Sequence, residues 1–232
     1  MMKEARIDHL VVAAASLDEG VRWCQNTLGV TPEPGGAHAL FGTHNRLVRL
    51  SSPEHPLAYL EIIAIDASVN PGRAAPLRRW FDLDAPAIHQ HLYESGPRLL
   101  HWVVSVPNIT DSVADLHALG IDRGRVIEAS RPAQQGMLRW KMTVRDDGQR
   151  LFGGALPTLI EWGSEHPARS MAEPVIALRS LRLQHPLADQ LQSALAAIGF
   201  MTLPVAVGPP GLSADLMLAD GTSLCLSHSE AP

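Results

Sequence analysis

Four polar side chains interrupt apolar runs of the sequence, and their types together could hold a metal ion. They are His9, Glu61, His101 and Glu161. A carboxylate buried without a partner costs several kcal/mol or takes up a proton, so two of them within apolar runs call for a cation, a metal ion or a role in proton transfer. Two imidazoles and two carboxylates suit Fe(II), Mn(II), Ni(II), Co(II) or Zn(II), and an octahedral ion with four protein ligands keeps two positions open for a substrate.

The same residues have a simpler interpretation as parts of a protein core. Each glutamate could pair with a nearby arginine, such as Arg46, Arg49 or Arg139, and each histidine could be a hydrogen-bonded core residue. For any one residue alone this interpretation is the better one. The four residues, however, occupy equivalent positions of an internal repeat, and that regularity favours the metal site.

The repeated unit consists of a strand and a helix followed by three more strands. The first copy begins at residues 6–30 and the second at residues 98–121, with His9 aligned on His101. Each copy opens with an apolar run suited to a buried strand and continues into apolar residues at the spacing of a helix. Short apolar runs separated by Gly, Pro and Ser then predict three strands joined by turns. Each copy therefore carries its histidine on the first strand and its glutamate on the last.

A third copy of the unit is weaker. Residues 177–200 keep the strand, the helix and a closing Gly199, but Ser180 and Cys225 stand at the positions of the histidine and the glutamate. This copy should therefore hold no metal. Between the first two copies, a segment with apolar residues at helical spacing predicts an inserted helical region that packs on the core, in preference to a lid.

These observations predict an α+β fold in which repeated βαβββ modules form curved mixed sheets around a cleft. Residues 1–168 hold the paired modules, with module 1 at about 5–66, the helical insertion at about 70–95 and module 2 at about 97–168. Residues 173–232 form a degenerate third module.

Several stretches of the sequence resemble the vicinal oxygen chelate superfamily, which includes glyoxalase I, extradiol dioxygenases, methylmalonyl-CoA epimerase and fosfomycin-resistance enzymes. The βαβββ units with histidine on the first strand and glutamate on the last carry the general likeness. More narrowly, bacterial glyoxalase-like domain proteins are similar to the stretches DHLVVAAASLDEGVRWCQNTLGV, GGAHALFGTHNRLVRL, YLEIIAID, LRWKMTV and LPTLIEWGSEHP. The likeness covers about residues 5–168, and its most specific part is the order GGxH, GTxN, YLE.

The resemblance implies a divalent metal (Zn, Ni, Mn, Co or Fe) held by His9, Glu61, His101 and Glu161, which match in residue type and strand. It implies a metal-dependent enzyme of the lyase or isomerase type, acting on a small molecule with vicinal oxygens. The metal would stabilise an enediolate while Glu161, the expected catalytic residue, moves a proton.

Substrate contacts are expected from three other residues. His38 and Asn45 lie in glycine-containing segments that are most simply turns, and the resemblance is the main support for placing them in the pocket. Trp140 could line the same pocket, although large rings are ordinary in a core.

Two other functions stay open at this point. A ring-cleaving dioxygenase of the extradiol type would typically use two histidines and one carboxylate on iron, and the fourth ligand argues against it. A metal-free protein could instead bind a small ligand in the same cleft, as a resistance protein does.

Composition limits the partners and the location. The net charge of −5 gives no broad attraction to nucleic acid or to anionic lipid. No run approaches the ~18–20 apolar residues of a membrane span, and the first residues lack the core of a signal peptide. Cys24 and Cys225 lie in apolar runs and are expected to be free core thiols of a reducing compartment. We therefore expect a cytoplasmic protein with a small-molecule substrate, and a homodimer is compatible with the sequence.

Overall fold

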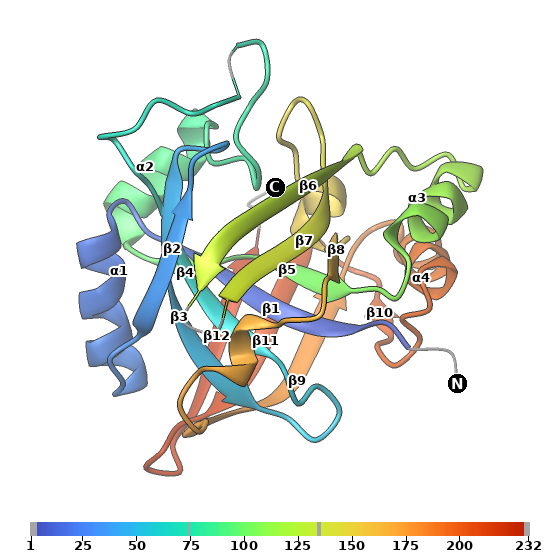
Figure 1. The fold of residues 1–232 in the computed structure, drawn as a ribbon. Coiled ribbons are helices and arrows are strands. Elements are labelled where there is room, and N and C mark those ends of the chain that lie inside the picture. Colours follow the sequence, from blue (N-terminus) through green and yellow to red (C-terminus); the bar gives the residue numbers. More distant parts are fainter. Residues whose placement is uncertain (1–3, 74, 134–135, 230–232) are drawn as a thin grey trace.

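A computed structural model describes residues 4–73, 75–133 and 136–229 and shows the first module in the expected order (Figure 1). Its elements are β1 (Arg6–Ala13), α1 (Leu17–Trp23), β2 (Glu33–His38), β3 (Thr43–Ser51) and β4 (Tyr59–Ile65). The hydroxyl of Ser16 accepts a hydrogen bond from the N–H of Glu19 and caps the first turn of α1. The helix continues as a π-helical turn, η1 (Cys24–Leu28), and ends at Gly29, whose φ of 71° is a conformation that glycine adopts without strain.

The second module has the same order of elements. They are β5 (Arg98–Ser105), α3 (Ile109–Ala118), β6 (Arg125–Ala133), β7 (Gly136–Val144) and β8 (Thr158–Trp162), with a short 3-10 helix, η2 (Leu151–Gly154), before β8. The side chain of Asn108 accepts hydrogen bonds from the N–H groups of Thr110 and Asp111 and caps α3.

The two modules join at the centre of one mixed sheet. Strand β1 pairs in parallel with β4 of its own module and antiparallel with β5 of the other module. The full order is β12-β11-β9-β3-β4-β1-β5-β8-β7-β6, with β2 on β3 and β10 on β9, and the sheet is not closed. The first strands of both modules, which carry the predicted histidines, therefore lie side by side.

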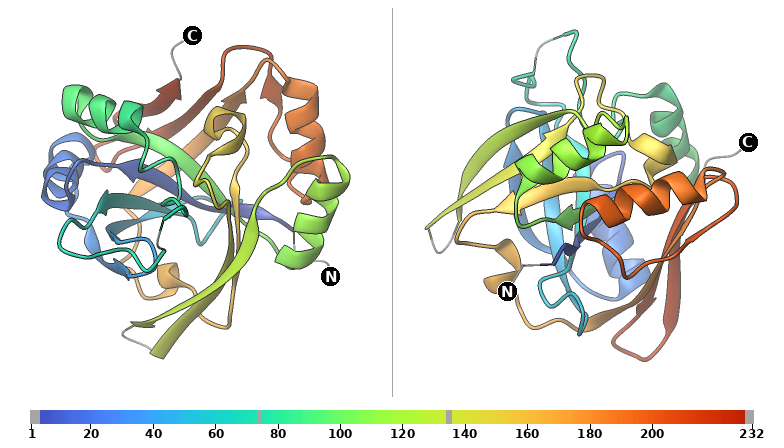
Figure 2. Two further views of the ribbon diagram at one scale, coloured as in Figure 1. Left: turned by 90° about the horizontal axis from the view of Figure 1, so that it is seen from above. Right: turned by 90° about the vertical axis from the view of Figure 1, so that its right-hand side faces the viewer.

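The third unit has the expected order of elements but a different order of strands. After a 3-10 turn, η3 (Pro167–Arg169), it comprises β9 (Ile176–Gln184), α4 (Ala188–Ala197), β10 (Val205–Ala206), β11 (Gly211–Met217) and β12 (Ser223–Ser229). In the first two modules the last strand pairs in parallel with the first, whereas here the short β10 does so and β11 pairs antiparallel with β9. Helix α4 lies beside α3 (Figure 2). The unit thus departs from the meander of its two predecessors.

Two apolar cores lie on opposite faces of the sheet. Leu10 and Val12 of β1 belong to the larger core, which also contains Leu212 and Leu226 of the third unit, so that unit packs on its own chain. Val11, from the alternate face of β1, belongs to the second core, because successive side chains of a strand point to opposite faces. His9 shares the parity of Val11 and is therefore directed to the side of the second core.

Only the second part of the predicted helical insertion is an α-helix, α2 (Pro86–Ser95). Phe81 and Asp82 adopt positive φ angles of 59° and 57°, a left-handed conformation that cannot continue a right-handed helix. The Asp82 carboxylate accepts a hydrogen bond from Arg150 Nε at 2.9 Å. Trp80 and Phe81 are buried in the second core, so this segment covers one face of the sheet as predicted, but as irregular chain.

The two cysteines differ in burial. Cys24 is buried as predicted, and its burial raises the pKa of the thiol to about 12. The prediction of a core thiol is wrong for Cys225. It is exposed because successive side chains of β12 point to opposite faces, and Leu226 and His228 occupy the buried face. No helix within the described residues is long and apolar enough to cross a membrane.

Candidate functional site

A cavity of about 40 Å³ lies on the side of the second core, where strands of both modules meet the segment before α2. Its polar lining consists of His9, His38, Asn45, Tyr59, Glu61 and Arg131. Its aromatic walls are Trp80, Phe81, Trp140 and Trp162. A volume of this size holds one to a few water molecules.

A bulge in β1 sets two consecutive polar side chains next to each other. The pairing with β5 passes from Ile7–Val104 directly to His9–Val103 and leaves Asp8 as the extra residue. The carboxylate oxygen Asp8 Oδ1 lies 2.7 Å from His9 Nδ1. The bulge therefore turns the sequence Asp8-His9 into a hydrogen-bonded pair.

The Asp8 carboxylate is 2% exposed and accepts three hydrogen bonds. The donors are His9 Nδ1, Trp162 Nε1 at 2.7 Å and His166 Nε2 at 3.1 Å. Burial alone would raise the pKa of Asp8, but the hydrogen bonds and charges of His166 and His9 outweigh it and hold this pKa well below its usual value. Asp8 is therefore ionised throughout the neutral range.

The ionised Asp8 fixes the tautomers of both histidines. His9 donates through Nδ1–H, and its other ring nitrogen, Nε2, lies 3.6 Å from Glu61 Oε2. His166 accepts the N–H of Ala168 at Nδ1 and therefore donates through Nε2–H. The ring of Tyr59 stacks on His9 at 4.6 Å and restricts its rotation. A basic imidazole nitrogen is thus held facing a carboxylate across a gap too long for a direct hydrogen bond.

Asn45 links the GGxH segment to Glu61. The N–H of Gly36 donates to Asn45 Oδ1 at 2.7 Å, which orients the amide so that Nδ2 donates to Glu61 Oε1 at 2.5 Å. Asn45 Nδ2 also lies 3.4 Å from His38 Nε2. Burial lowers the pKa of His38 to about 4, so the ring is neutral and can donate from Nδ1 to Thr43 Oγ1 at 3.1 Å.

Gly35 leaves the space that Asn45 occupies. A Cβ at Gly35 would lie 2.6 Å from the backbone oxygen of Asn45 and closer still to its side-chain oxygen. We therefore expect Gly35→Ala to displace Asn45 and to lower the free energy of unfolding by roughly 1–3 kcal/mol. Gly72→Ala is the control, because its Cβ would meet its nearest atom at 3.4 Å, and it should change stability by no more than about 0.5 kcal/mol. Equal urea midpoints for Gly35→Ala and wild type would contradict this packing.

His101 lies outside this group, although its ring is fully buried. Its Nδ1 donates to the carbonyl of Gly154 at 3.1 Å, and its Nε2 accepts the N–H of Thr158 at 3.2 Å. Burial, and then the charges of Arg123 and Arg150, lower the pKa of His101 well below its usual value. Both nitrogens are committed to the protein, so His101 is a neutral hydrogen-bonded core residue.

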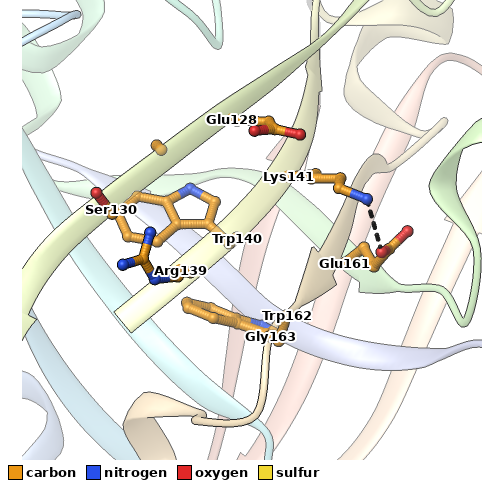
Figure 3. Close-up of a pocket in the computed structure, with 9 residues that line it drawn as sticks. Glu128, Ser130, Arg139, Trp140, Lys141, Glu161, Trp162 and Gly163 are labelled. Atoms are coloured by element: carbon orange, nitrogen blue, oxygen red, sulfur yellow. Dashed lines mark hydrogen bonds and ion pairs between the residues drawn. The ribbon is translucent and has the colours of Figure 1, made fainter. Parts of the chain in front are cut away.

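Glu161 also lies away from the cavity. It follows Ile160 and precedes Trp162, which both line the cavity, and successive side chains of β8 point to opposite faces. Glu161 Oε1 pairs with Lys141 Nζ at 3.1 Å (Figure 3), and Oε2 accepts the N–H of Ile109 at 2.8 Å. These contacts place it in a separate surface pocket of about 420 Å³.

The predicted ligand set for a metal is therefore not brought together. His9 and Glu61 share the cavity, whereas His101 has no free nitrogen and Glu161 faces the other side of the sheet. Among the residues that the structure describes, no group of three or more His, Cys, Asp or Glu side chains could hold a metal ion. The arrangement does not fit the four-ligand divalent site.

The structure places the three expected substrate contacts, His38, Asn45 and Trp140, on the wall of the cavity. The sequence reasoning did not single out Asp8, His166, Arg131 or Trp80. A signal for Asp8 was present, because it is a carboxylate inside the same apolar run as His9. No comparable signal marked His166, which reaches Asp8 from the turn after β8.

Three buried histidines held neutral predict a protein that loses stability in acid. Burial lowers the pKa of His38 to about 4 and of His228 to about 3, and the pKa of His101 is also depressed. Below about pH 6.5 the unfolded chain binds protons at these histidines and the folded chain does not, so the free energy of unfolding falls as the pH falls.

His38 alone should account for about 2 kcal/mol of this loss at pH 5. Urea denaturation at a series of pH values measures it, and His38→Asn should give a shallower slope between pH 7 and pH 5. His117→Asn, at an exposed position on α3, should keep the wild-type slope. A wild-type stability that is constant over this range would rule out neutral buried histidines.

The fold and the site together define an α+β protein in which paired βαβββ modules enclose a small polar cavity. The sequence matches the family described as "Glyoxalase-like domain" over residues 7–199, and no curated protein matches it. The chain belongs to the glyoxalase-like domain family, as predicted.

A solved structure with a TM-score above 0.5 has a similar fold, and structures with lower scores also match. A hypothetical protein from Staphylococcus aureus shares 14% sequence identity with a TM-score of 0.59, over 97% of this chain and 88% of that chain. Methylmalonyl-CoA epimerase from Streptomyces coelicolor shares 18% identity with a TM-score of 0.42, over 71% of this chain and 99% of that chain. The epimerase from Mycobacterium tuberculosis shares 17% identity with a TM-score of 0.39, over 71% and 91% of the two chains.

Proposed function

We propose that the protein is an enzyme of the isomerase or lyase type that moves a proton on a small molecule with neighbouring oxygens, and that His9 is the base. The observation that carries this proposal is the buried Asp8–His9 pair, which presents Nε2 to the cavity 3.6 Å from Glu61 Oε2. A ligand that faces both groups from the cavity can lose a carbon-bound or hydroxyl hydrogen to His9 Nε2. The proton can then return from His9, or from Glu61 after it has passed from His9 Nε2 to Glu61 Oε2. The neighbouring oxygens of the proposed substrate are inferred from the family and not from the geometry of the cavity.

Each side chain has a defined part in this step. Asp8 stabilises the imidazolium that forms when His9 takes the proton, because its carboxylate already accepts the Nδ1–H. Asn45 holds Glu61 through Oε1 and leaves Oε2 facing His9. If the proton returns to the same or a neighbouring carbon the reaction is an isomerisation, and if a group leaves from that neighbour it is an elimination.

Because the four predicted ligands do not assemble, no step of this proposal uses a metal, and the proposed base is His9 rather than Glu161. The same observation removes the support for a ring-cleaving dioxygenase, since His101 and Glu161 lie away from the cavity and no three His, Cys, Asp or Glu side chains of the described residues are grouped so that they could hold a metal ion. A metal-free binding protein is the second candidate, and the four aromatic rings of the cavity wall favour it.

Deuterium exchange tests the proposal without knowledge of the product. Short 2-oxo and 2-hydroxy acids, their esters and amides, and small dicarbonyl compounds are incubated with the protein in D₂O and followed by proton NMR. We expect catalysed deuterium incorporation beside an oxygen-bearing carbon of at least one compound, unchanged after dialysis against EDTA. A rate that EDTA abolishes and Zn, Ni, Mn, Co or Fe restores would contradict the metal-free route, and tight binding without exchange would favour the binding protein.

A further inference from the structure

Arg131 brings a positive charge to the cavity, and no direct ion pair with a described residue engages it. It lies on β6, is half-buried and lines the cavity together with His9 and Glu61. Its recorded hydrogen bond runs from Nη1 to the carbonyl of Gly35 at 3.3 Å, and no carboxylate of the described residues lies within ion-pair distance of it. A guanidinium has five N–H donors, so most of its donor capacity is open to a ligand.

Trp80 adds an unsatisfied donor to the same cavity. Its side chain is 5% exposed and lines the cavity, and its indole N–H has no hydrogen-bond partner among the residues that the structure describes. The ring is held in place by stacking on Phe41 at 3.9 Å and on Phe81 at 5.1 Å. A buried donor without a partner is unfavourable, so a ligand oxygen that accepts this N–H would gain affinity.

Glu61 is the other charged group of the cavity lining, and it already has partners. Its Oε1 accepts from Asn45, and its Oε2 faces His9. His38 is neutral, so it does not compete with Arg131 for an anion. The deep end of the cavity, where His9 and Glu61 are each 5% exposed, therefore suits a proton transfer, and the half-exposed Arg131 suits an anionic group.

Resting on the proposed function, we propose that the ligand is a short 2-oxo or 2-hydroxy carboxylate whose carboxylate binds Arg131. The neighbouring oxo or hydroxyl oxygen accepts the N–H of Trp80, and the carbon acid faces His9. The small size of the cavity, about 40 Å³, favours a short ligand over one with a long acyl chain. Arginine suits this task because its planar fork matches a carboxylate with two parallel hydrogen bonds.

Binding of charged and uncharged analogues tests this inference. Glyoxylate, pyruvate, lactate and 2-oxobutanoate are titrated against the full-length protein by calorimetry, alongside the methyl esters of the same acids. We expect at least one acid to bind ten times or more tightly than its ester. Arg131→Gln should remove that preference. Trp80→Phe, which keeps a stacked ring, should lower the affinity for the acid by about fivefold.

Arg125→Gln is the matched control. Arg125 lies on the same strand, but its side chain is 77% exposed, pairs with Asp146 and does not line the cavity. This variant should keep the wild-type preference for the acid. Thermal melts of all variants confirm that each is folded before the affinities are compared.

Three results would overturn the inference. The first is that no acid binds, and the second is that acid and ester bind equally. The third is that Arg131→Gln lowers the affinity for acid and ester alike, which would mean that Arg131 only balances the charge of Glu61. The outcome is separable from that of the proposed function. Acids that bind through Arg131 without deuterium exchange contradict the enzyme alone, and exchange on neutral compounds that is independent of Arg131 contradicts this inference alone.

Discussion

Replacing Asp8 by asparagine is expected to lower the free energy of unfolding by roughly 3 kcal/mol, which for a chain of this length is a fall in Tm of about 6–12 °C. Asp8 is a buried carboxylate that accepts from His9, Trp162 and His166. An asparagine keeps one acceptor oxygen but turns an N–H₂ group toward donors that point at it. One of the two imidazoles must then change tautomer or lose its hydrogen bond, and the charge that stabilises both is gone.

The dependence on pH separates this effect from simple loss of packing. The pKa of Asp8 is depressed in the folded state, so its contribution to stability is fully present above the unfolded value near 3.8 and is lost as the pH falls further. The difference between wild type and Asp8→Asn measured by urea denaturation should therefore narrow below about pH 4. Asp115→Asn, at an exposed position on α3, should match wild type at every pH. An Asp8→Asn protein as stable as wild type at neutral pH would show that the carboxylate is not held as described.

Replacing His9 by glutamine is expected to lower the rate of deuterium exchange by 10²–10⁴-fold, because the cavity loses its base. Glutamine can still donate to Asp8, so the fold should survive with a modest loss of stability. Exchange rates of the two proteins on the same compound in D₂O measure the effect. Added imidazole should partly restore exchange to His9→Gly, since the space of the missing ring opens onto the cavity.

His44→Gln is the control for this experiment. His44 is half-buried on β3, lies 3.7 Å from Asp66 and does not line the cavity. Its exchange rate should stay within twofold of wild type. If His9→Gln retains most of the exchange while Glu61→Gln loses it, the base is Glu61 and the part given to His9 is wrong.

The repeat in the sequence predicted the sheet well, because strand and helix periods depend on local patterns that each copy shows independently. It predicted the third unit less well. The pairing of β9 with β11 depends on tertiary contacts, and the pattern of apolar residues in 177–200 does not indicate it. The insertion shows the same limit. Its apolar spacing is helical throughout, but Phe81 and Asp82 adopt left-handed conformations that bring Trp80 against the cavity.

The site was predicted in part, and strand geometry explains where the prediction stopped. His9 and Glu61 were predicted because burying a polar side chain in an apolar strand is costly unless it has a partner. Both face the same cavity. The same logic selected Glu161, but successive side chains of a strand point to opposite faces, and Glu161 lies on the face away from the cavity, paired with Lys141.

The places of two further residues, His101 and Asp8, depend on structural details that a sequence does not show. His101 meets both of its hydrogen-bonding needs within the core, at Gly154 and Thr158. Asp8 reaches His9 only because of the bulge in β1, which no pattern in the sequence marks.

We expect Asp8 to hold His9 as the Nδ1–H tautomer, with a free Nε2 facing Glu61. Long-range ¹H–¹⁵N correlation spectra of protein labelled with ¹⁵N at its histidines test it most directly, with His9→Gln and His166→Gln used to assign the two rings. At neutral pH we predict that His9 shows a protonated Nδ1 and an unprotonated Nε2, that His166 shows the opposite pattern, and that Asp8→Asn disturbs both. A His9 ring protonated at Nε2, or at both nitrogens, would contradict the account.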